Sequence, residues 1–397
     1  MNGPLSGFRV VDLTNVISGP MATQILGDQG ADIVKVEARD GDLTRGGGNR
    51  QGGFPAAFLN NNRNKRSIVL DLKRAEGVAL LKRLAAAADV FIQNFRPGVV
   101  ERLGVGETEI RAVKPDIVYV SISGFGEKGP LASKPTYDPI VQAISGLTTV
   151  QAGSDEERPR LVRTILPDKV TALTAAQAVT AALLHRAATG EGQHVRVSML
   201  DSVVAFLWNS DMGSQTFVDA PVSIQRAASF IDLIYETANG YMSVSLMTDR
   251  QWLSFCKVAG RADLATDPRF ATPALRDENI DARLEQVQEV LRTRTTAEWT
   301  ALFDAGHVPS APVLTRSQMV EHPQVAANGT LLEYDHPLAG RLRQARPAVR
   351  FEGSPSGIRR GGPELGVDTR EVLAEAGVAE DEIEAAIARG VAGTGAP

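Results

Sequence analysis

Residues 9–37 read RVVDLTNVISGPMATQILGDQGADIVKVE, and this stretch decides the fold. Residues 9–13 and 33–37 are short β-rich runs, which predict two strands. Residues 21–28 lie between them and predict a helix that Gly30 ends. A strand, a helix and a second strand in this order build a parallel sheet with helices on its faces. The stretch therefore places this part of the chain in the α/β class.

The same alternation continues outward from this stretch. Residues 67–71, 89–94 and 117–123 predict three further strands. Residues 171–188 are rich in alanine and contain neither glycine nor proline, so they predict a long helix, which Gly190 ends. We therefore expect one large α/β domain over this half of the chain.

Changes in the hydrophobic pattern divide the chain into five parts. The large domain takes up residues 1–208, and residues 209–229 lose the periodicity and predict a linker. Residues 230–320 combine a strand pattern with an amphipathic helical pattern and predict a smaller α+β domain. Residues 321–362 are rich in glycine, proline and arginine and predict a second linker. Residues 363–397 predict a helical pair followed by a frayed tail.

Composition and charge exclude several classes of protein. The 397 residues are 43% hydrophobic and 22% charged, which is typical of globular chains with two or three domains. The 42 Lys and Arg against 47 Asp and Glu give a net charge of −5, too acidic for a protein that coats nucleic acid. No apolar run approaches the roughly 18 residues of a membrane span, and the N-terminus lacks a signal-peptide pattern. We expect a cytoplasmic protein with neither nucleic-acid nor membrane partners.

The residues that usually bind metals are sparse. Cys256 is the only cysteine, which excludes intramolecular disulfides, iron–sulfur clusters and thiolate zinc sites. The 5 histidines are scattered, and none lies three or four residues from another on a predicted helix. We therefore expect no metal centre, and the single cysteine fits a reducing compartment.

Residues 124–129 read GFGEKG and match the G-x-G-x-x-G pattern of dinucleotide-binding turns. Such a turn has to open a helix whose first amides hold the pyrophosphate. Here Pro130 and Pro135 follow, without an apolar helical stripe. We therefore expect a flexible glycine turn, and the backbone amides from Gly124 onward remain candidates to line an elongated ligand.

Basic residues gather near the predicted carboxyl ends of strands, the edge at which open α/β sheets bind ligands. This position favours a phosphate-rich ligand, and the alternative is a solvated basic surface. The residues concerned are Arg39, Arg45, Arg63, Lys65, Arg66, Arg96 and Arg102.

Asp168 stands in the sequence LPDK at the start of the alanine-rich helix. An aspartate at a helix start usually caps the free amides or offsets the helix dipole. The same position suits a catalytic carboxylate that must stay ionised, because the dipole favours its charged form. The residues alone leave both interpretations open.

Short motifs recur along nearly the whole chain, and each is weak singly, but their order is specific. The motifs are PLSGFRVVDLT at 4–14, GP at 19–20, GDQGADIVKVE at 27–37, GDLTR at 41–45, NKRS at 64–67, LDLK at 70–73, QNFRPG at 93–98, GFG at 124–126, GP at 129–130, GY at 240–241, DPRF at 267–270, EW at 298–299 and HP at 322–323. In this order they resemble the class III CoA-transferases. That family includes formyl-CoA and carnitine CoA-transferases and the α-methylacyl-CoA racemases.

The resemblance implies a Rossmann-like, CoA-binding large domain built from both chain ends, residues 1–208 and 363–397. It also implies a smaller domain between long linkers and an interlocked homodimer. The expected substrates are an acyl-CoA and a free carboxylic acid acceptor. Coenzyme A is then a substrate, and no cofactor is expected to be bound permanently.

The resemblance also implies roles for individual residues. Asp168 stands at the position of the family's nucleophile, which attacks the thioester to form a mixed anhydride and then an aspartyl-CoA thioester. The residues expected to hold CoA are Arg39, Asn94, Phe95, Arg102, Gly124 and Tyr137.

The residue at position 137 distinguishes a CoA-transferase from a racemase of the family. In the family that this chain resembles, the racemases look to have a histidine base just before the residue that corresponds to Asp138. This chain has Tyr137 at that position. A tyrosine with an ordinary pKa of about 10 is a poor base at neutral pH. We therefore expect a CoA-transferase, with a racemase or a non-catalytic CoA-binding homologue as the alternatives. The acyl group is left undetermined, because Ile17 stands where well-known transferases of the family have a glutamine.

Overall fold

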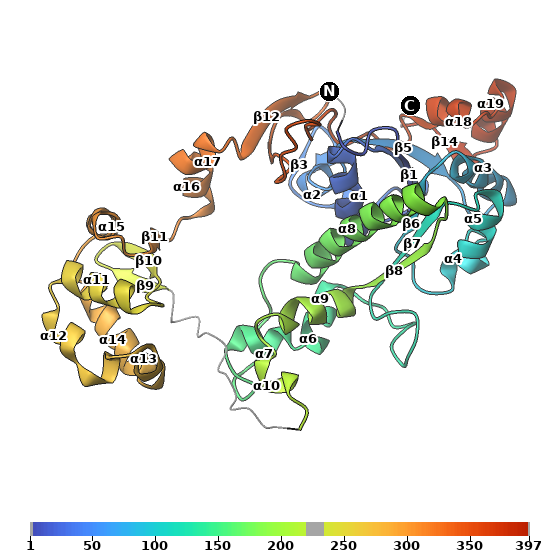
Figure 1. Ribbon diagram of the computed structural model, residues 1–397. Coiled ribbons are helices and arrows are strands. Elements are labelled where there is room, and N and C mark those ends of the chain that lie inside the picture. Colours follow the sequence, from blue (N-terminus) through green and yellow to red (C-terminus); the bar gives the residue numbers. More distant parts are fainter. Residues whose placement is uncertain (1–2, 220–233, 396–397) are drawn as a thin grey trace. The chain divides into compact units, whose positions relative to one another are not determined.

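The computed structural model describes residues 3–219 and 234–395, and the chain divides into two compact units (Figure 1). The first unit takes in Met1–Gln151, Arg158–Val218 and Asn328–Pro397. The second takes in Ala152–Glu157 and Asp219–Ala327. Each unit has a hydrophobic core of its own and is described by itself.

A seven-stranded sheet forms the centre of the first unit, in the order β14-β5-β2-β1-β6-β7-β8. Neighbouring strands are parallel, except that β14 runs antiparallel to β5. The α/β class expected from residues 9–37 is confirmed. The strands are β1 (Arg9–Asp12), β2 (Asp32–Glu37), β5 (Lys65–Leu70), β6 (Val90–Gln93), β7 (Val118–Ser123), β8 (His194–Ser198) and β14 (Ala392–Gly393).

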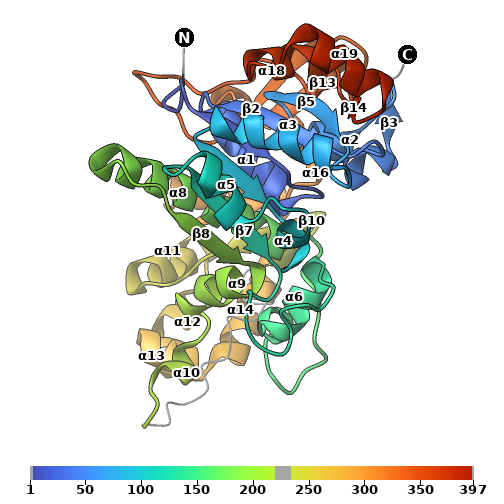
Figure 2. The same cartoon turned by 90° about the vertical axis from the view of Figure 1, so that its right-hand side faces the viewer.

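Helices cover both faces of this sheet, because successive side chains of a strand point to opposite faces. Val10 belongs to a core with helices α1 (Ser18–Asp28) and α8 (Leu166–Thr189). Val11 belongs to the core on the other face, with α3 (Ala75–Ala86), α5 (Glu107–Val113), α18 (Thr369–Glu375) and α19 (Glu380–Ala388) (Figure 2). The first unit is therefore a three-layer α/β/α structure.

Short elements connect these layers. They are η1 (Leu43–Gly46), β3 (Arg50–Gln51), β4 (Phe54–Pro55), α2 (Ala56–Leu59), α4 (Val99–Arg102), α6 (Asp138–Ile144), α7 (Leu147–Ala152), α9 (Met199–Trp208), α10 (Gly213–Thr216), β12 (Leu331–His336) and β13 (Gly340–Ala345).

The alanine-rich helix α8 begins at Leu166, five residues before the expected start. Pro167 is compatible with this start, because the first helical turn does not use the missing N–H. Gly190 ends the helix in a left-handed conformation, φ 81°, as predicted. Asp168 therefore lies inside the first turn of the helix and not ahead of it.

The end of the chain differs from the frayed tail that was expected. Val391 and Ala392 are buried, and the amide of Asp71 donates a hydrogen bond of 2.8 Å to the carbonyl of Val391. The strand β14 thereby completes one edge of the sheet beside β5. A two-residue strand carries no visible alternation, so the sequence pattern did not reveal it.

Part of the segment 321–362 is a hairpin and not a linker. Strands β12 and β13 pair antiparallel, and Ala339 at their turn is buried against Phe58 and Leu59. Gln344 donates a hydrogen bond of 2.9 Å to the carbonyl of Leu59. The hairpin alternates weakly in hydrophobicity because it covers only a small apolar cluster. The other predicted linker, residues 209–229, contains the short helix α10, and its residues from 220 onward lie outside the described residues.

The second unit packs helices around a small antiparallel sheet in the order β11-β10-β9. Trp252, Phe255, Trp299 and Phe303 form the centre of its core. The amphipathic helical pattern expected within residues 230–320 is confirmed by α14 (Ile280–Leu291). The other elements are β9 (Tyr235–Thr237), β10 (Gly240–Val244), α11 (Asp249–Ala259), α12 (Ala262–Thr266), η3 (Pro268–Phe270), α13 (Pro273–Glu278), α15 (Thr296–Ala305), β11 (Ser310–Pro312), α16 (Arg316–Glu321) and α17 (Pro323–Ala327).

Candidate active site

A cavity of about 210 Å³ lies in the first unit, where the strand order reverses between β1 and β6. Open α/β sheets bind ligands at this switch point, beyond the carboxyl ends of the strands. Asn15 follows β1, Asn94 follows β6 and Gly124 follows β7, and all three line the cavity. Of the residues predicted from the sequence, the cavity brings together Asn94, Phe95, Gly124, Tyr137 and Asp168.

Asp168 is the carboxylate of this cavity. Its backbone amide donates a hydrogen bond of 3.2 Å to Oδ2 of Asp138. Burial and, to a smaller extent, the nearby charge of Asp138 raise the pKa of Asp168 to about 6, although hydrogen bonds from the side chain and backbone of Ser18 lower it. At neutral pH the group is mostly ionised, and the cavity holds a negative oxygen that is poorly solvated.

The alternative role of Asp168 as a helix cap does not match this arrangement. The N-cap residue of α8 is Ile165, which makes no side-chain capping hydrogen bond. The hydrogen bonds that stabilise the Asp168 carboxylate come from Ser18, the first residue of a different helix, α1. The carboxylate therefore faces the positive end of a second helix dipole, which favours its charged form.

Asp138 supports Asp168 from the first turn of α6. Its side chain is buried, and its Oδ1 accepts a hydrogen bond of 2.6 Å from Nε2 of Gln142. Burial raises the pKa of Asp138, and the hydrogen bonds from Gln142 and from the Asp168 amide lower it. The two carboxylates are thus connected through the backbone of Asp168.

Buried charges fix the loop that carries Ser18. Lys35 is fully buried, and its Nζ donates hydrogen bonds of 2.8 Å to the carbonyl of Thr14 and 2.9 Å to Oδ2 of Asp42. Oδ1 of Asp42 accepts a hydrogen bond of 3.3 Å from the amide of Val16. Val16 has φ 72°, a left-handed conformation that costs a β-branched residue about 1–3 kcal/mol. The surrounding contacts hold the loop in this strained shape.

A second buried lysine holds the other end of the loop. Nζ of Lys65 donates hydrogen bonds of 2.9 Å to the carbonyl of Pro20 and 3.2 Å to Oδ2 of Asp12. Burial lowers the pKa of Lys65 to about 8, although the charge of Asp12 raises it. Gly19 packs against Thr14 so closely that an added Cβ would lie 2.2 Å from Thr14 Cβ. The start of α1 is thereby fixed against the sheet.

The turn after β6 is tied to the same loop. The amide of Asn15 donates 2.9 Å to Oδ1 of Asn94, and Nδ2 of Asn94 donates 2.8 Å back to the carbonyl of Asn15. The amide of Phe95 donates 2.8 Å to Oε1 of Gln93. These bonds hold the backbone of Asn94 and Phe95 at the rim of the cavity.

The glycine turn after β7 opens no helix, since the next helix is α6 at Asp138. The alternative of a dinucleotide-binding turn therefore lacks the helix that it requires. At Gly124 an added Cβ would lie 2.7 Å from Cβ of Thr136, so only glycine fits this close approach. The turn lines the cavity with backbone in place of a side chain.

Several predicted basic residues do not line the cavity. Arg39 donates 2.8 Å to the carbonyl of Gly390, and Arg102 lies exposed on α4. Arg63 and Arg66 also lie outside the cavity lining, and their guanidinium groups pair with Asp28 and Asp32 at 2.7 and 2.6 Å. Of the basic residues singled out, only Arg96 lines the cavity.

Sequence reasoning missed Ser18, Asp138 as a contact of Asp168, and Gln142. Ser18 directly precedes the Gly19-Pro20 motif, and this position was the one signal in the sequence that could have indicated it.

Within the described ranges no group of three or more histidine, cysteine or acidic residues is placed to hold a metal ion. No helix in the same residues is both long and apolar enough to cross a bilayer.

Comparisons with known proteins agree with this architecture. The profile of a family described as CoA-transferase family III matches residues 5–369. Succinyl-CoA:glutarate CoA-transferase of Mus musculus is 33% identical, over 94% of this chain and 86% of that protein. An acyl-CoA transferase of Fusarium pseudograminearum is 34% identical, over 96% of this chain and 86% of that protein. A crystal structure of Rv3272 from Mycobacterium tuberculosis superposes with a TM-score of 0.82 at 32% identity, over 93% of this chain and 99% of that chain.

Proposed function

The chain belongs to CoA-transferase family III, and we propose that it moves CoA from an acyl-CoA thioester to a free carboxylic acid through covalent intermediates on Asp168. One observation carries the proposal. The carboxylate of Asp168 lines the same cavity as Asn94, Phe95 and Tyr137, three positions at which the family resemblance implies CoA binding. The activities for which the relatives are named, CoA transfer from succinyl-CoA to glutarate among them, support the same reaction type.

The reaction exchanges one thioester for another of similar energy, so it needs no ATP. A carboxylate oxygen of Asp168 attacks the thioester carbon, the C–S bond breaks, and CoA leaves as a thiolate. The product is a mixed anhydride between Asp168 and the acyl group. The thiolate then attacks the Asp168 carbonyl of the anhydride and releases the first acid as a carboxylate. Asp168 now carries CoA as a thioester.

The second half of the reaction reverses these steps with the acceptor acid. The acceptor carboxylate attacks the aspartyl-CoA thioester and expels the thiolate. The product is a new anhydride between the acceptor and Asp168. The thiolate attacks the acyl carbonyl of this anhydride, and Asp168 leaves as a free carboxylate. A covalent nucleophile thereby divides one difficult exchange into easier steps.

The electrostatics of the cavity fit these steps. With its pKa at about 6, Asp168 is available as a nucleophile at neutral pH, and its partial burial keeps the carboxylate poorly solvated and reactive. Each attack places negative charge on a tetrahedral oxygen, which backbone amides stabilise in water-excluded sites. The amides around Ser18 and in the turn from Gly124 are the candidates for this role.

Mass spectrometry of the Asp168 peptide tests the proposal. The protein is incubated with acyl-CoA, treated with hydroxylamine and digested. We expect a hydroxamate on Asp168 that is absent from Asp168→Ala. Asp201→Ala is the matched control, because Asp201 occupies the same position in the first turn of α9 but does not line the cavity. An unmodified Asp168 peptide together with sustained turnover would eliminate the covalent scheme. Solvent deuterium uptake at the acyl α-carbon would indicate epimerisation instead.

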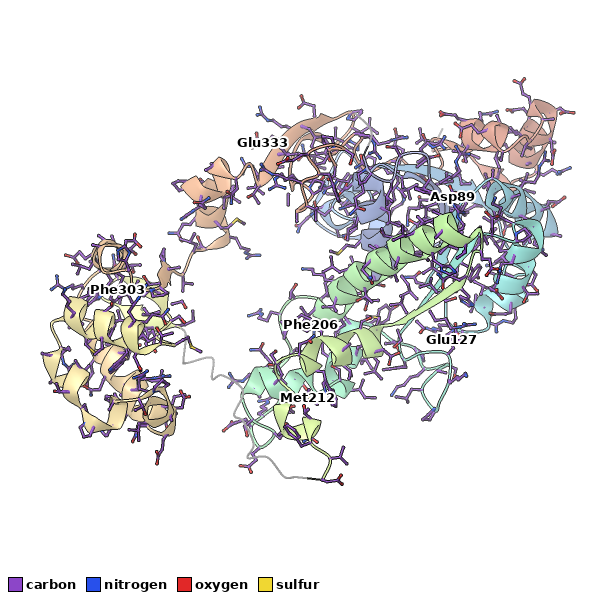
Figure 3. All side chains as sticks on the ribbon, in the orientation of Figure 1. Asp89, Glu127, Phe206, Met212, Phe303 and Glu333 are labelled. Atoms are coloured by element: carbon purple, nitrogen blue, oxygen red, sulfur yellow. The ribbon has the colours of Figure 1, made fainter. Side chains whose placement is uncertain are left out.

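We extend the proposal to an interlocked homodimer, which the family resemblance implies. Large apolar side chains on two helices of the first unit support it. Leu184 on α8 is 72% exposed, and Phe206 and Trp208 on α9 are 49% and 48% exposed (Figure 3 labels Phe206). We expect the partner chain to cover these side chains, since contiguous exposed apolar surface marks contacts between proteins. Light scattering of the purified protein is expected to give the mass of two chains, and a stable monomer would contradict the extension.

A further inference from the structure

Gln142 is a buried side-chain amide that does not line the cavity but is connected to Asp168. It is 2% exposed and lies in α6, four residues after Asp138 and therefore on the same face of the helix. Its Nε2 donates hydrogen bonds of 2.6 Å to Oδ1 of Asp138 and of 3.3 and 3.4 Å to the carbonyls of Val162 and Thr164. Its Oε1 accepts a hydrogen bond of 2.9 Å from the amide of Val162. Both polar atoms of the side chain are therefore used.

The partners allow only one orientation of this amide. A carboxylate and two carbonyls can only accept hydrogen bonds, and the backbone amide of Val162 can only donate one. Exchange of the amide oxygen and nitrogen would therefore place acceptor against acceptor and donor against donor. An ionised carboxylate at position 142 would fail in the same way, because it has no hydrogen to donate to Asp138. The surroundings thus require a neutral amide and not only a side chain of this size.

Gln142 is connected to Asp168 along two routes. The first runs through Asp138, whose Oδ2 accepts the hydrogen bond of 3.2 Å from the Asp168 amide. The second runs through residues 162–164, which lead directly into the first turn of α8. Residues 158–165 belong to no helix or strand, so hydrogen bonds from other elements have to fix their course. One side chain thus holds both the backbone that precedes Asp168 and the carboxylate that accepts its amide.

The environment of α6 offers no substitute for this amide. Helix α6 packs against α8 and α9 (Figure 1), and α9 meets it through apolar side chains. The charge of Lys169 on α8 acts on Asp138, but within the described residues the two form no ion pair, and Nζ of Lys169 donates 2.7 Å to Oγ1 of Thr164. The hydrogen bond from Gln142 is the shorter of the two that the structure gives the Asp138 carboxylate.

We propose that Gln142 is a positioning residue for the transfer reaction, whose amide connects Asp138 to residues 162–164 and so directs the Asp168 carboxylate into the cavity. The inference rests on the proposed function, because Asp168 has to be the group that reacts. A misplacement of about 1 Å can reduce the rate of a reaction about a hundredfold. Loss of the amide should therefore lower kcat and leave KM for acyl-CoA nearly unchanged, since Asn94 and Phe95 belong to the turn after β6.

A single and a double variant test this role. Gln142→Glu keeps the shape of the side chain but removes the hydrogen bond to Asp138 and places two acidic groups side by side. Asp138→Asn in the same protein restores the connection with donor and acceptor exchanged. The new amide donates to the new carboxylate and accepts from the backbone of Asp168, and the amide of Val162 keeps an acceptor. Only the two longer hydrogen bonds to backbone carbonyls stay unmade.

We expect kcat of Gln142→Glu to fall about tenfold to hundredfold, the usual effect of losing a hydrogen bond to a charged group. The double variant should recover most of this loss. The rate at which Asp168 is acylated, measured by trapping the hydroxamate, should fall and recover with kcat. Thermal unfolding checks that each variant is folded. Gln318→Glu is the matched control, because Gln318 is exposed and a glutamate accepts the same hydrogen bonds from Thr315.

A role in packing alone gives a different pattern. The double variant would then be at least as impaired as Gln142→Glu, and this result would overturn the proposal. An unchanged kcat in Gln142→Glu, or a rise in KM for acyl-CoA equal to the fall in kcat, would overturn it as well. If Gln142→Glu does not fold, Gln142→Met takes its place, because methionine fills a similar volume without a hydrogen-bond donor to Asp138. Wild-type kcat in Gln142→Met, or failure of every variant at this position to fold, would also overturn the proposal.

The outcomes separate this inference from the function on which it rests. An Asp168 hydroxamate in the wild-type protein, without recovery in the double variant, would keep the proposed function and remove the role of Gln142. Recovery of kcat in the double variant, without a hydroxamate in any of the proteins, would keep the positioning role and remove the covalent scheme.

Discussion

The backbone amide of Asp168 donates a hydrogen bond of 3.2 Å to the side chain of Asp138. This bond places two acidic side chains of different helices next to each other, one exposed to the cavity and one buried behind it. Burial and the charge of Asp138 together raise the pKa of Asp168 to about 6. The reactivity of Asp168, the proposed nucleophile, should therefore depend on pH and on the charge of Asp138.

The pH dependence of kcat/KM is expected to reflect the titration of Asp168 next to Asp138. Activity of the wild-type enzyme should fall as the pH drops through about 6, because protonated Asp168 is no nucleophile. Asp138→Asn removes the neighbouring charge, so the pKa of Asp168 falls and the acid limb moves to lower pH, by up to about one unit. The measurement is a full pH profile of kcat/KM for both proteins. An acid limb that stays in place would show that Asp138 does not act on Asp168 electrostatically.

Asp168→Asn is expected to stabilise the protein at neutral pH while it abolishes transfer. The pKa of Asp168 is higher in the folded chain, about 6, than its ordinary value of 3.8, so the folded state loses stability as the pH rises through this interval. Above about pH 6 the buried charge costs on the order of 2 kcal/mol, which asparagine avoids. Thermal unfolding at about pH 8 and about pH 4 measures the effect. The gain in thermal stability of the variant over the wild type should be smaller at about pH 4 than at about pH 8. An equal or larger gain at about pH 4 would contradict the expected direction of the pH dependence.

Lys35→Met is expected to damage both stability and turnover. The variant leaves Asp42 buried without its cation and frees the carbonyl of Thr14, which should destabilise the first unit by about 3–5 kcal/mol. The loop with Ser18 loses an anchor, so kcat should fall more than KM changes. Urea unfolding and steady-state kinetics check the two effects. Arg83→Met is the control, because its pair with Glu382 is exposed and contributes at most about 1 kcal/mol.

Gly124→Ala is expected to displace the segment opposite the glycine turn. The new methyl group would lie 2.7 Å from Cβ of Thr136, an overlap that usually costs about 1–3 kcal/mol. Because Thr136 and Tyr137 line the cavity, KM for acyl-CoA should rise. Thr136→Gly in the same protein should relieve the overlap and restore binding. Gly46→Ala meets no neighbour within 4 Å and serves as the control. A Gly124→Ala variant with unchanged KM would exclude a close approach at this turn.

Much of the fold is local in origin and therefore predictable. The alternation of strands and helices around residues 9–37 needs only hydrophobic periodicity and glycine signals, and the parallel sheet follows from it. Gly190 ends the long helix for the same local reason. Elements that lack a local signal were missed. The strand β14 has two residues, and the hairpin β12–β13 covers only a small cluster.

The candidate site was predictable only in part. One cavity is lined by five of the predicted residues, Asn94, Phe95, Gly124, Tyr137 and Asp168. Arg39 and Arg102 lie outside its lining. Those two arginines carry the right charge at the right edge of the sheet. Arg39, however, donates to the carbonyl of Gly390, a partner 351 residues away. No pattern of spacing or composition reveals a partner at that separation.

The sequence by itself determined the layered α/β architecture, the family and the placement of an aspartate at the start of an alanine-rich helix. These properties depend on neighbours along the chain, and short-range periodicity and motif order record them. Only the tertiary structure decided that Ser18 and Asp138 flank Asp168, that Lys35 and Lys65 are buried, and that Gln142 connects Asp138 to residues 162–164. Each of these depends on burial and on hydrogen bonds between elements far apart in the chain, which exist only once the sheet has brought its strand ends together.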